Sequence, residues 1–258
     1  MAPGITFVVA VNNRQILADN FLASPCLQPH HPHQVILQES FRSAATAYND
    51  AIERSVNDLM VFLHQDVVLP KGWLSDLWRA LECLQGMDPN WGVLGCYGET
   101  ADDNGRGRIY APGQGFLGKP LERPAAVQTL DEIVLILRRS SGLRFDERLP
   151  HFHLYGPGIC LAAAARGKKS YAISALCVHN TQQIFVLPPE FYECYAQFRR
   201  IWKDELPIRT TCVTVTRSNF PVFVRRLQEI YMRYIAHKTV GARRATNIPQ
   251  VLKGLDAD

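Results

Sequence analysis

Uninterrupted apolar runs in the first part of the chain predict strands that are buried on both faces. Ile5–Val11 and Leu59–Leu63 contain almost no polar side chains. A shorter run, Val35–Leu37, has the same character, and the segment WGVLGCYG at 91–98 adds a further strand. Because the runs are short and end abruptly in polar residues, they predict strands separated by other elements.

Two stretches between these runs repeat apolar residues every three or four positions, which is the spacing of one helix face. The first follows a predicted cap at Ser40, and the second follows a Pro-Lys-Gly turn. Strands that alternate with helices indicate an α/β fold, with a largely parallel sheet and helices on both faces. The apolar positions are Phe41, Ala44, Ala45, Tyr48, Ile52 and Val56 in the first helix and Trp73, Leu74, Leu77, Trp78, Leu81 and Leu84 in the second.

Polar side chains stand just past the end of each early strand. Asn12 follows the first strand, Glu39 the second and Asp66 the third, where the chain reads LHQDVVLPKGW. In open α/β sheets, ligands bind beyond the carboxyl ends of the strands. The pattern therefore predicts a binding crevice that includes Asp66, although a carboxylate here could instead cap the following turn.

The pattern is lost between residues 98 and 126, where glycines are frequent and periodicity is weak. Such a stretch predicts a long mobile loop, and loops of this length often act as lids. Its NGRGR segment could bring Arg106 and Arg108 to a phosphate or could be plain surface. It is not a P-loop, because no Gly-Lys-Ser/Thr follows.

Order returns in the second half of the chain. The segment VQTLDEIVLILRR at 127–139 predicts a strand. Ile159–Arg166 predicts a short helix ended by Gly167. Tyr171–Val178 predicts another strand, with His179 just past its end.

The C-terminal segment carries the positive charge of the protein. From Arg217 onward there are eight basic residues against three acidic ones. Apolar residues recur at helical spacing from Phe220 to Ile235, with arginines on the opposite face. We expect this amphipathic helix to pack on its own domain and solvate its charges. The alternative is peripheral contact with a membrane surface or an acidic partner.

The composition is that of a folded protein, with 258 residues, 47% of them hydrophobic and 20% charged. Its seven cysteines are scattered without a CxxC pair, which predicts reduced thiols and a cytoplasmic location. We expect no secretory signal, and no apolar run reaches the roughly 18–20 residues that span a bilayer. The expected organisation is a main domain at 1–185 with a helical, basic extension at 186–258.

The order of these motifs resembles that of GT-A glycosyltransferases of the family-2-like group, in a branch that has His-Gln-Asp in place of the usual DxD triplet. The matching stretches cover residues 5 to about 180. They are FVVAVNN (7–13), AYNDAI (47–52), VFLHQDVVLPKGW (61–73), VQTLDEIVLILRR (127–139), FDERLPHFHLYG (145–156) and CVHN (177–180).

This resemblance implies a Rossmann-like GT-A domain that binds a nucleotide-diphosphate sugar, with UDP as the expected nucleotide. The last residue of the triplet, Asp66, and the later His179 would hold Mn²⁺ or Mg²⁺. A divalent cation neutralises the diphosphate as the glycosidic bond breaks. His64 stands where the first acid of the triplet would be, so its role is less defined.

The resemblance also implies a nucleotide site around the strand ends. Val11 and Asn12 would hold the base, and Glu39 would accept from uracil or from a ribose hydroxyl. His64 and Gln65 would complete this site. Glu39 could otherwise be only a favourable charge near a helix N-terminus.

One departure concerns the catalytic base. Inverting members of the family carry a carboxylate in a Tyr-Gly-x-Asp motif, and here the same position is Gly158. Asp146 and Glu147 are expected to stabilise the acceptor region, which leaves His151 and His153 as substitutes. In an extended segment these two would point to the same side, and His153 is closer to the gap. The alternative is a nucleotide-sugar or glycan-binding module that has lost its base.

Other functions have weaker support. The tract PHHPH at 29–33 is flanked by prolines and predicts a solvated turn rather than a metal site. A nucleic-acid partner has only the basic tail in its favour, without interleaved aromatic residues. A nucleotidyltransferase would carry a Gly-rich basic signature near its first strand, and VNNRQIL is not one. The acceptor is left open between a glycan, a lipid-linked group and a small molecule.

Overall fold

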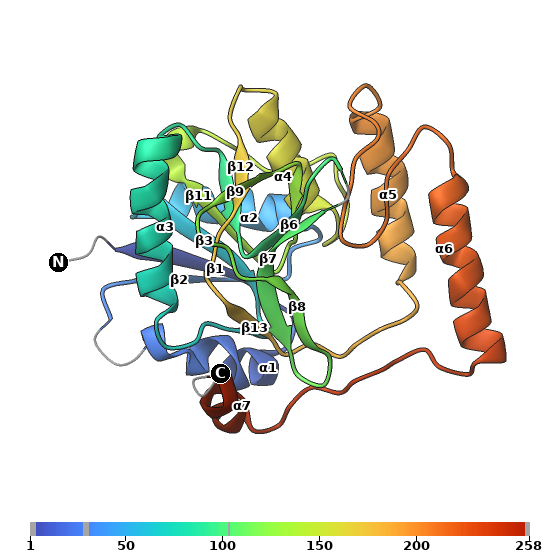
Figure 1. Ribbon diagram of the computed structural model, residues 1–258, viewed down its shortest axis with the longest axis horizontal. Coiled ribbons are helices and arrows are strands. Elements are labelled where there is room, and N and C mark those ends of the chain that lie inside the picture. Colours follow the sequence, from blue (N-terminus) through green and yellow to red (C-terminus); the bar gives the residue numbers. More distant parts are fainter. Residues whose placement is uncertain (1–3, 28–30, 103, 256–258) are drawn as a thin grey trace.

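A computed structural model describes residues 4–27, 31–102 and 104–255 (Figure 1). It is an α/β structure with two sheets and helices packed around them. Part of the histidine tract, Pro29 and His30, lies outside the described residues. In the described remainder, the ring of His33 contacts that of Phe7, and its Nδ1 accepts a hydrogen bond from the N–H of Ile5 at 3.3 Å. His33 therefore anchors the start of the first strand.

The larger sheet begins with three parallel strands whose carboxyl ends share one edge. Strand β1 pairs in parallel with β2 and with β3, so that Val11 lies opposite Glu39 and Ala10 opposite His64. The sheet order is β2-β1-β3-β11-β5-β12-β9. The strands are β1 (Ile5–Val11), β2 (Gln34–Glu39), β3 (Leu59–His64), β5 (Val93–Gly95), β9 (Ala125–Val127), β11 (Val134–Arg138) and β12 (Ser170–Ala172).

The sheet is mixed rather than largely parallel, which corrects part of the sequence-based expectation. Strand β11 is antiparallel to both β3 and β5, and β9 is antiparallel to β12. Parallel neighbours need a crossover connection, usually a helix, whereas antiparallel neighbours do not. The chain enters β11 from the smaller sheet and not from a helix, and it enters in the opposite direction.

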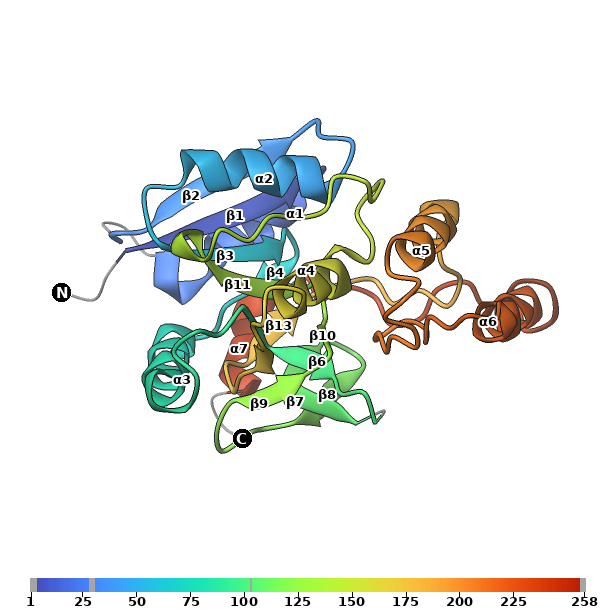
Figure 2. The same cartoon turned by 90° about the horizontal axis from the view of Figure 1, so that it is seen from above.

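Helices cover both faces of this sheet, as expected. Alternate residues of β1 point to opposite sides: Phe7 and Val9 join one apolar cluster, and Val8 joins the other. Helices α1 (Arg14–Asp19) and α3 (Trp73–Met87) belong to the first cluster. Helices α2 (Ala44–Arg54) and α4 (Tyr155–Ala164) belong to the second. Figure 2 shows α2 and α3 on opposite sides of the sheet.

The smaller sheet arises because three segments that were predicted as single strands each bend from one sheet into the other. Segment 91–98 contributes β5 and then β6, segment 127–139 contributes β10 and then β11, and segment 171–178 spans β12 and β13. An apolar run does not show where a buried chain bends. The strands of the smaller sheet are β4 (Val67–Val68), β6 (Tyr97–Glu99), β7 (Gly105–Ala111), β8 (Gly115–Lys119), β10 (Thr129–Leu130) and β13 (Cys177–His179). Their order is β10-β6-β7-β13-β4, with β8 beside β7.

The prediction of a mobile lid at 98–126 is wrong. Most of this stretch is the antiparallel hairpin β7–β8, and β7 is also paired with β6 and β13. At Gly107 the backbone has φ +93°, and a Cβ would collide with the carbonyl oxygen of Cys96. At least this glycine therefore reflects the close approach of strands and not flexibility.

The start of α2 also differs from the prediction. Its N-cap is Ser43, whose hydroxyl accepts from the N–H of Thr46 at 3.3 Å. Ser40, the expected cap, has φ +64° and belongs to the turn after β2. Serine favours both turns and caps, so residue type alone did not distinguish the two positions.

The C-terminal extension is helical, and two of its helices join apolar clusters of the α/β unit. Helix α5 (Pro189–Ile201) packs Phe191 and Phe198 in a cluster with Leu149 and Leu154. Helix α7 (Ile248–Leu255) packs Ile248 in a cluster with Val68 and Val178. Short 3₁₀ helices occur at Phe21–Ala23, Pro25–Leu27 and Arg139–Ser141.

Helix α6 (Phe220–Ile230) and the π-helical turn Tyr231–Ile235 come between α5 and α7 in the sequence. In space they lie at the outer edge of the molecule, beside α5 (Figure 1). Their apolar side is exposed, contrary to the expectation that it packs on the domain. In the described part of the chain, no helix combines the length and apolar character that crossing a bilayer requires.

Candidate metal and nucleotide site

Asn12, Glu39 and Asp66, which follow the first three strands, line one cavity of about 700 Å³, whereas His179 is not part of its lining. It lies at the carboxyl edge of β1, β2 and β3, where the parallel register brings their ends together. Tyr155 and Phe152 close its opposite side. The cavity is lined by Ala10, Val11, Asn12, Arg14, Gln38, Glu39, Ser40, Phe41, Tyr48, His64, Gln65, Asp66, Phe152 and Tyr155.

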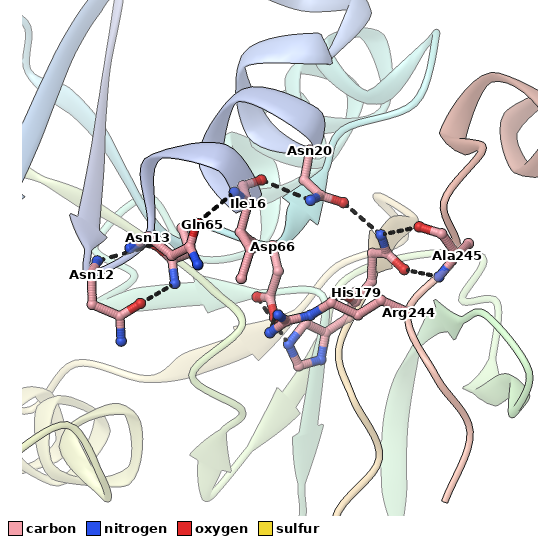
Figure 3. A network of polar contacts seen from close by, with 10 residues as sticks. Asn12, Asn13, Ile16, Asn20, Gln65, Asp66, His179, Arg244 and Ala245 are labelled. Atoms are coloured by element: carbon pink, nitrogen blue, oxygen red, sulfur yellow. Dashed lines mark hydrogen bonds and ion pairs between the residues drawn. The ribbon is translucent and has the colours of Figure 1, made fainter.

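Gln65 holds the loop that follows β1. Its side-chain oxygen accepts from the N–H groups of Asn12 and Asn13 at 3.1 and 3.0 Å. Its amide nitrogen donates to Oδ1 of Asn12 at 2.5 Å (Figure 3). These bonds use an amide as both donor and acceptor, which neither a carboxylate nor an apolar side chain could do. Gln65 therefore positions the loop predicted to hold the base.

Asp66 is buried and lies beside a histidine and an arginine. Its Oδ1 lies 3.4 Å from Nε2 of His179, and its Oδ2 lies 3.1 Å from Nη2 of Arg244 (Figure 3). Burial by itself would raise the pKa of this carboxyl. The hydrogen bond and charge of His179, with the charges of His64 and Arg244, outweigh burial and hold the pKa of Asp66 well below its usual value. The group is therefore a carboxylate at any physiological pH.

His64, Asp66 and His179 form a cluster with metal-ligand geometry. One ligand atom of each lies within 4.8 Å of the others. The ring centroids of His64 and His179 are 5.5 Å apart, and Nε2 of His64 is 2.9 Å from the hydroxyl of Tyr155. Burial, and then the neighbouring His179, lowers the pKa of His64, so its ring stays neutral near pH 7. Neutral imidazoles are metal ligands.

The donor set fits a divalent cation and favours one kind. Two imidazoles with one carboxylate suit Mn²⁺, which accepts nitrogen ligands, better than Mg²⁺, which prefers oxygen. His179 stands in β13 and Asp66 precedes β4, and these strands are paired, with His179 opposite Val67. The smaller sheet thus brings His179 to the edge of the larger sheet.

Arg244 was not identified from the sequence, where it counted only as part of the basic tail. It lies 178 positions from Asp66 in the chain. Asn180 holds the tail in place: its side chain accepts from the N–H of Ala245 at 2.7 Å and donates to the carbonyl of Ala245 at 3.0 Å and to Asn20 at 2.8 Å (Figure 3). Arg244 also donates from Nε to the carbonyl of Asn180 at 3.1 Å.

This arrangement makes Arg244 a competitor for any cation at Asp66. We expect Arg244→Ala to raise the affinity for Mn²⁺ roughly threefold to tenfold, because the variant no longer loses a partly exposed ion pair when the metal binds. Titration of Mn²⁺ followed by electron paramagnetic resonance, without nucleotide, measures this. Arg243→Ala is the matched control, since Arg243 is exposed. Equal affinities in all three proteins would mean that Arg244 does not oppose the metal.

Glu39 is engaged at the mouth of the cavity. Its two carboxylate oxygens each lie 2.8 Å from the guanidinium of Arg14. The hydrogen bond from Arg14 lowers the pKa of Glu39. Arg14 is largely exposed, so the pair adds little stability. The role predicted for Glu39, acceptance from a base or a ribose hydroxyl, stays a prediction and would have to share the carboxylate with Arg14.

The two histidines proposed as bases do not lie in an extended segment, which corrects the alternation argument. The backbone of His151 has φ +57° and that of Leu154 has φ +60°. The ring of His151 pairs with Glu193 at 2.7 Å, and that of His153 lies edge-on to Phe191. Neither lines the cavity, although Phe152 between them does. Burial lowers the pKa of His153, and its charge acts on His64.

Gly158 is buried inside α4 and could not present a base to the cavity. A Cβ there would lie 3.1 Å from Cδ1 of Leu149 and 4.0 Å from Cε2 of Phe198. Both neighbours are apolar and belong to the cluster beneath α5. A side chain at this position would therefore meet the apolar packing between α4, Leu149 and α5.

A second residue missed from the sequence is Glu132. Its Oε1 accepts from the N–H of Gly156 at 3.2 Å, at the start of α4. A Cβ on Gly156 would lie 2.9 Å from Cγ of Glu132, so glycine permits this approach. Burial, and then the charge of Asp131, raises the pKa of Glu132 to about 8. In the sequence, Asp131 and Glu132 interrupt the apolar run LDEIV, and this interruption could have indicated a buried acidic side chain.

Comparison with known proteins gives distant matches. No family model matches the chain. A curated protein of Fuscovulum blasticum, described as ATP synthase subunits region ORF 6, is 27% identical over 145 residues, which is 49% of this chain and 53% of that protein. The chain thus spans about half the length of this relative.

Two solved structures have similar shapes at low sequence identity. A mannosyltransferase from Pyrobaculum calidifontis, in complex with GDP-Man and Mn²⁺, is 11% identical with a TM-score of 0.48, covering 91% of this chain and 71% of that one. A protein from STIV is 15% identical with a TM-score of 0.41, covering 66% of this chain and 82% of that one.

Proposed function

We propose that this protein transfers a sugar from a nucleotide-diphosphate sugar to an acceptor, with Mn²⁺ bound at His64, Asp66 and His179. One observation carries the proposal. A single cavity joins the loop at Asn12, held by Gln65, to His64 and Asp66 at the carboxyl edge of parallel strands, and His179 lies beside Asp66 in the same carboxylate–imidazole cluster. The resemblance to GT-A glycosyltransferases gives Asp66 and His179 the role of metal ligands, and His64 is added here because it belongs to the same cluster.

Each part of the cavity has a task in this proposal. The loop at Val11 and Asn12 receives the nucleoside, and Asp66 and the two histidines lie where the diphosphate would end. When bound there, the divalent cation would offset the negative charge that develops on the departing diphosphate. Tyr155, hydrogen-bonded to His64, keeps that imidazole oriented. UDP is the proposed nucleotide.

His153 is the proposed base that accepts the proton of the acceptor hydroxyl. Its lowered pKa keeps the imidazole neutral at physiological pH, and it stands next to Phe152, which lines the cavity. Because the pKa lies below the ordinary value, transfer should fall only when the pH drops below about 6.5.

The test begins with ligand binding. We expect one class of nucleotide sugar to raise the melting temperature by roughly 5 °C in the presence of Mn²⁺ and by much less with EDTA. Release of the free nucleoside diphosphate in the presence of acceptors then measures turnover. His153→Ala should lower kcat by about 10²-fold or more with little change in nucleotide affinity. His151→Ala, whose ring pairs with Glu193, is the comparison.

The packing around Gly158 favours one second candidate, a binding module without turnover. A carboxylate base at that position would press on Leu149 and Phe198, both apolar. Metal-dependent stabilisation by nucleotide sugars without product, across acceptors of several classes, would support this candidate over the transferase. No stabilisation by any nucleotide sugar would contradict both.

A further inference from the structure

Helix α6 and the turn Tyr231–Ile235 present their apolar side to solvent. Large apolar side chains on this segment are each between 48% and 68% exposed. They recur every three or four positions and so share one face. A continuous exposed apolar face of this kind is unusual on a soluble protein and marks a binding surface. Its members are Phe220, Phe223, Leu227, Ile230, Tyr231, Tyr234 and Ile235.

The orientation is maintained by polar contacts on the inner side. Glu229 is 7% exposed and accepts hydrogen bonds from the N–H of Leu187 and from Nε of Arg225, both at 3.1 Å. Arg225 also donates to the carbonyl of Phe185 at 3.4 Å. The guanidinium of Arg226 lies 4.3 Å from the ring centroid of Tyr192 on α5. These contacts, with Val222 packed against the apolar cluster of α5, hold the inner side of the helix, while its larger apolar side chains face outward.

Basic residues border the apolar face. Arg226 and Arg233 lie on the helix and turn, and Lys238 follows. A groove of about 800 Å³ between α5 and α6 adds further basic side chains above an apolar floor. Asp204 is the acidic residue in its lining. Its basic lining residues are Arg199, Arg200, Lys203, Arg217 and Arg226.

We propose that α6 and the turn Tyr231–Ile235 dock on an anionic lipid bilayer. The apolar face would enter the boundary between headgroups and acyl chains, and the basic border would contact lipid phosphates. Phenylalanine and tyrosine suit this boundary region. The segment is too short and too charged on one side to span the membrane, so it lies parallel to the surface.

Charge distinguishes this occupant from a second copy of the chain. In a two-fold dimer the same patch meets itself, so the basic borders of both copies would come together. Like charges across an interface are unfavourable. An anionic surface instead satisfies the apolar face and the basic border together. This inference uses neither the cavity nor the metal cluster, and it stands independently of the proposed transfer.

Vesicle sedimentation with the full chain tests the proposal. We expect binding to phosphatidylcholine vesicles that contain phosphatidylglycerol, much weaker binding without it, and loss of affinity at high salt. Phe223→Ser combined with Tyr234→Ser should weaken binding by at least tenfold. Arg233→Gln combined with Lys238→Gln, which leaves the Arg226–Tyr192 contact in place, should remove the preference for anionic vesicles.

Matched controls separate docking from general surface effects. Val56→Ser alters another exposed apolar residue, and Lys71→Gln another exposed basic one, and both should bind as the wild type does. Circular dichroism checks that each variant is folded. No preference for anionic vesicles, or equal losses in the controls, would overturn the proposal. A dimer in sedimentation velocity that dissociates when Phe223 and Tyr234 are replaced would also overturn it, in favour of a second copy.

Discussion

Asp66→Asn is expected to remove the Mn²⁺ dependence of nucleotide binding, lowering metal affinity by more than about 100-fold. Replacement of residues that only orient metal ligands costs roughly 10- to 100-fold, and loss of a carboxylate ligand should cost at least as much. Calorimetric titration of UDP, with Mn²⁺ and with EDTA, measures the effect. In the wild type the two titrations should differ strongly, and in the variant they should coincide.

Glu39→Gln is the matched control, because Glu39 lines the same cavity but lies outside the metal cluster. It should keep the metal dependence even if its nucleotide affinity changes. Retention of full metal dependence by folded Asp66→Asn would reduce Asp66 to a structural partner of Arg244.

The same variant has a pH signature in stability. The pKa of Asp66 is lower in the folded protein than in the unfolded chain, so its contribution to stability is present above the unfolded value of about 4 and is lost as pH falls below it. The wild type should therefore exceed Asp66→Asn in free energy of unfolding at neutral pH. The difference should shrink progressively in acid, which urea unfolding at several pH values can follow.

Gly158→Asp is expected to destabilise the protein by about 3–5 kcal/mol and to confer no activity. The new carboxylate would be forced against Leu149 and Phe198, where no described cation or donor compensates it. Chemical unfolding monitored by tryptophan fluorescence measures the loss. Restoring the residue type that the resembled family has at this position would thus damage this protein.

Gly158→Ala separates charge from volume at the same site. A methyl group would contact Leu149 at 3.1 Å, while alanine favours the helix by about 1 kcal/mol over glycine, so the net change should be small. A folded Gly158→Asp protein with new transfer activity would show that this position faces the acceptor after all. It would also favour the reading of the native chain as a binding module.

The strands that build the cavity could be derived from the sequence because their signals are local. Ile5–Val11 forms β1 as predicted, and β3 differs from its prediction by one residue. Parallel strands end at one edge, so Asn12, Glu39 and Asp66 could be brought together without knowing the rest of the fold. A strand end followed by polar residues is visible within a few positions of the chain.

The tertiary structure alone determined two kinds of feature. One is contact between segments that are distant in sequence, and the other is which face of an amphipathic helix packs against the protein. Arg244 contacts Asp66 although the two are 178 positions apart, and no sequence pattern near either residue predicts this contact. The environment of Gly158 depends on α5, which is separate in sequence from α4. The helix at Phe220–Ile230 was recognised from its periodicity, but periodicity defines two faces without saying which one packs. In the structure the side that carries Glu229, with its hydrogen bonds, and Val222 packs inward, and the larger apolar face is exposed.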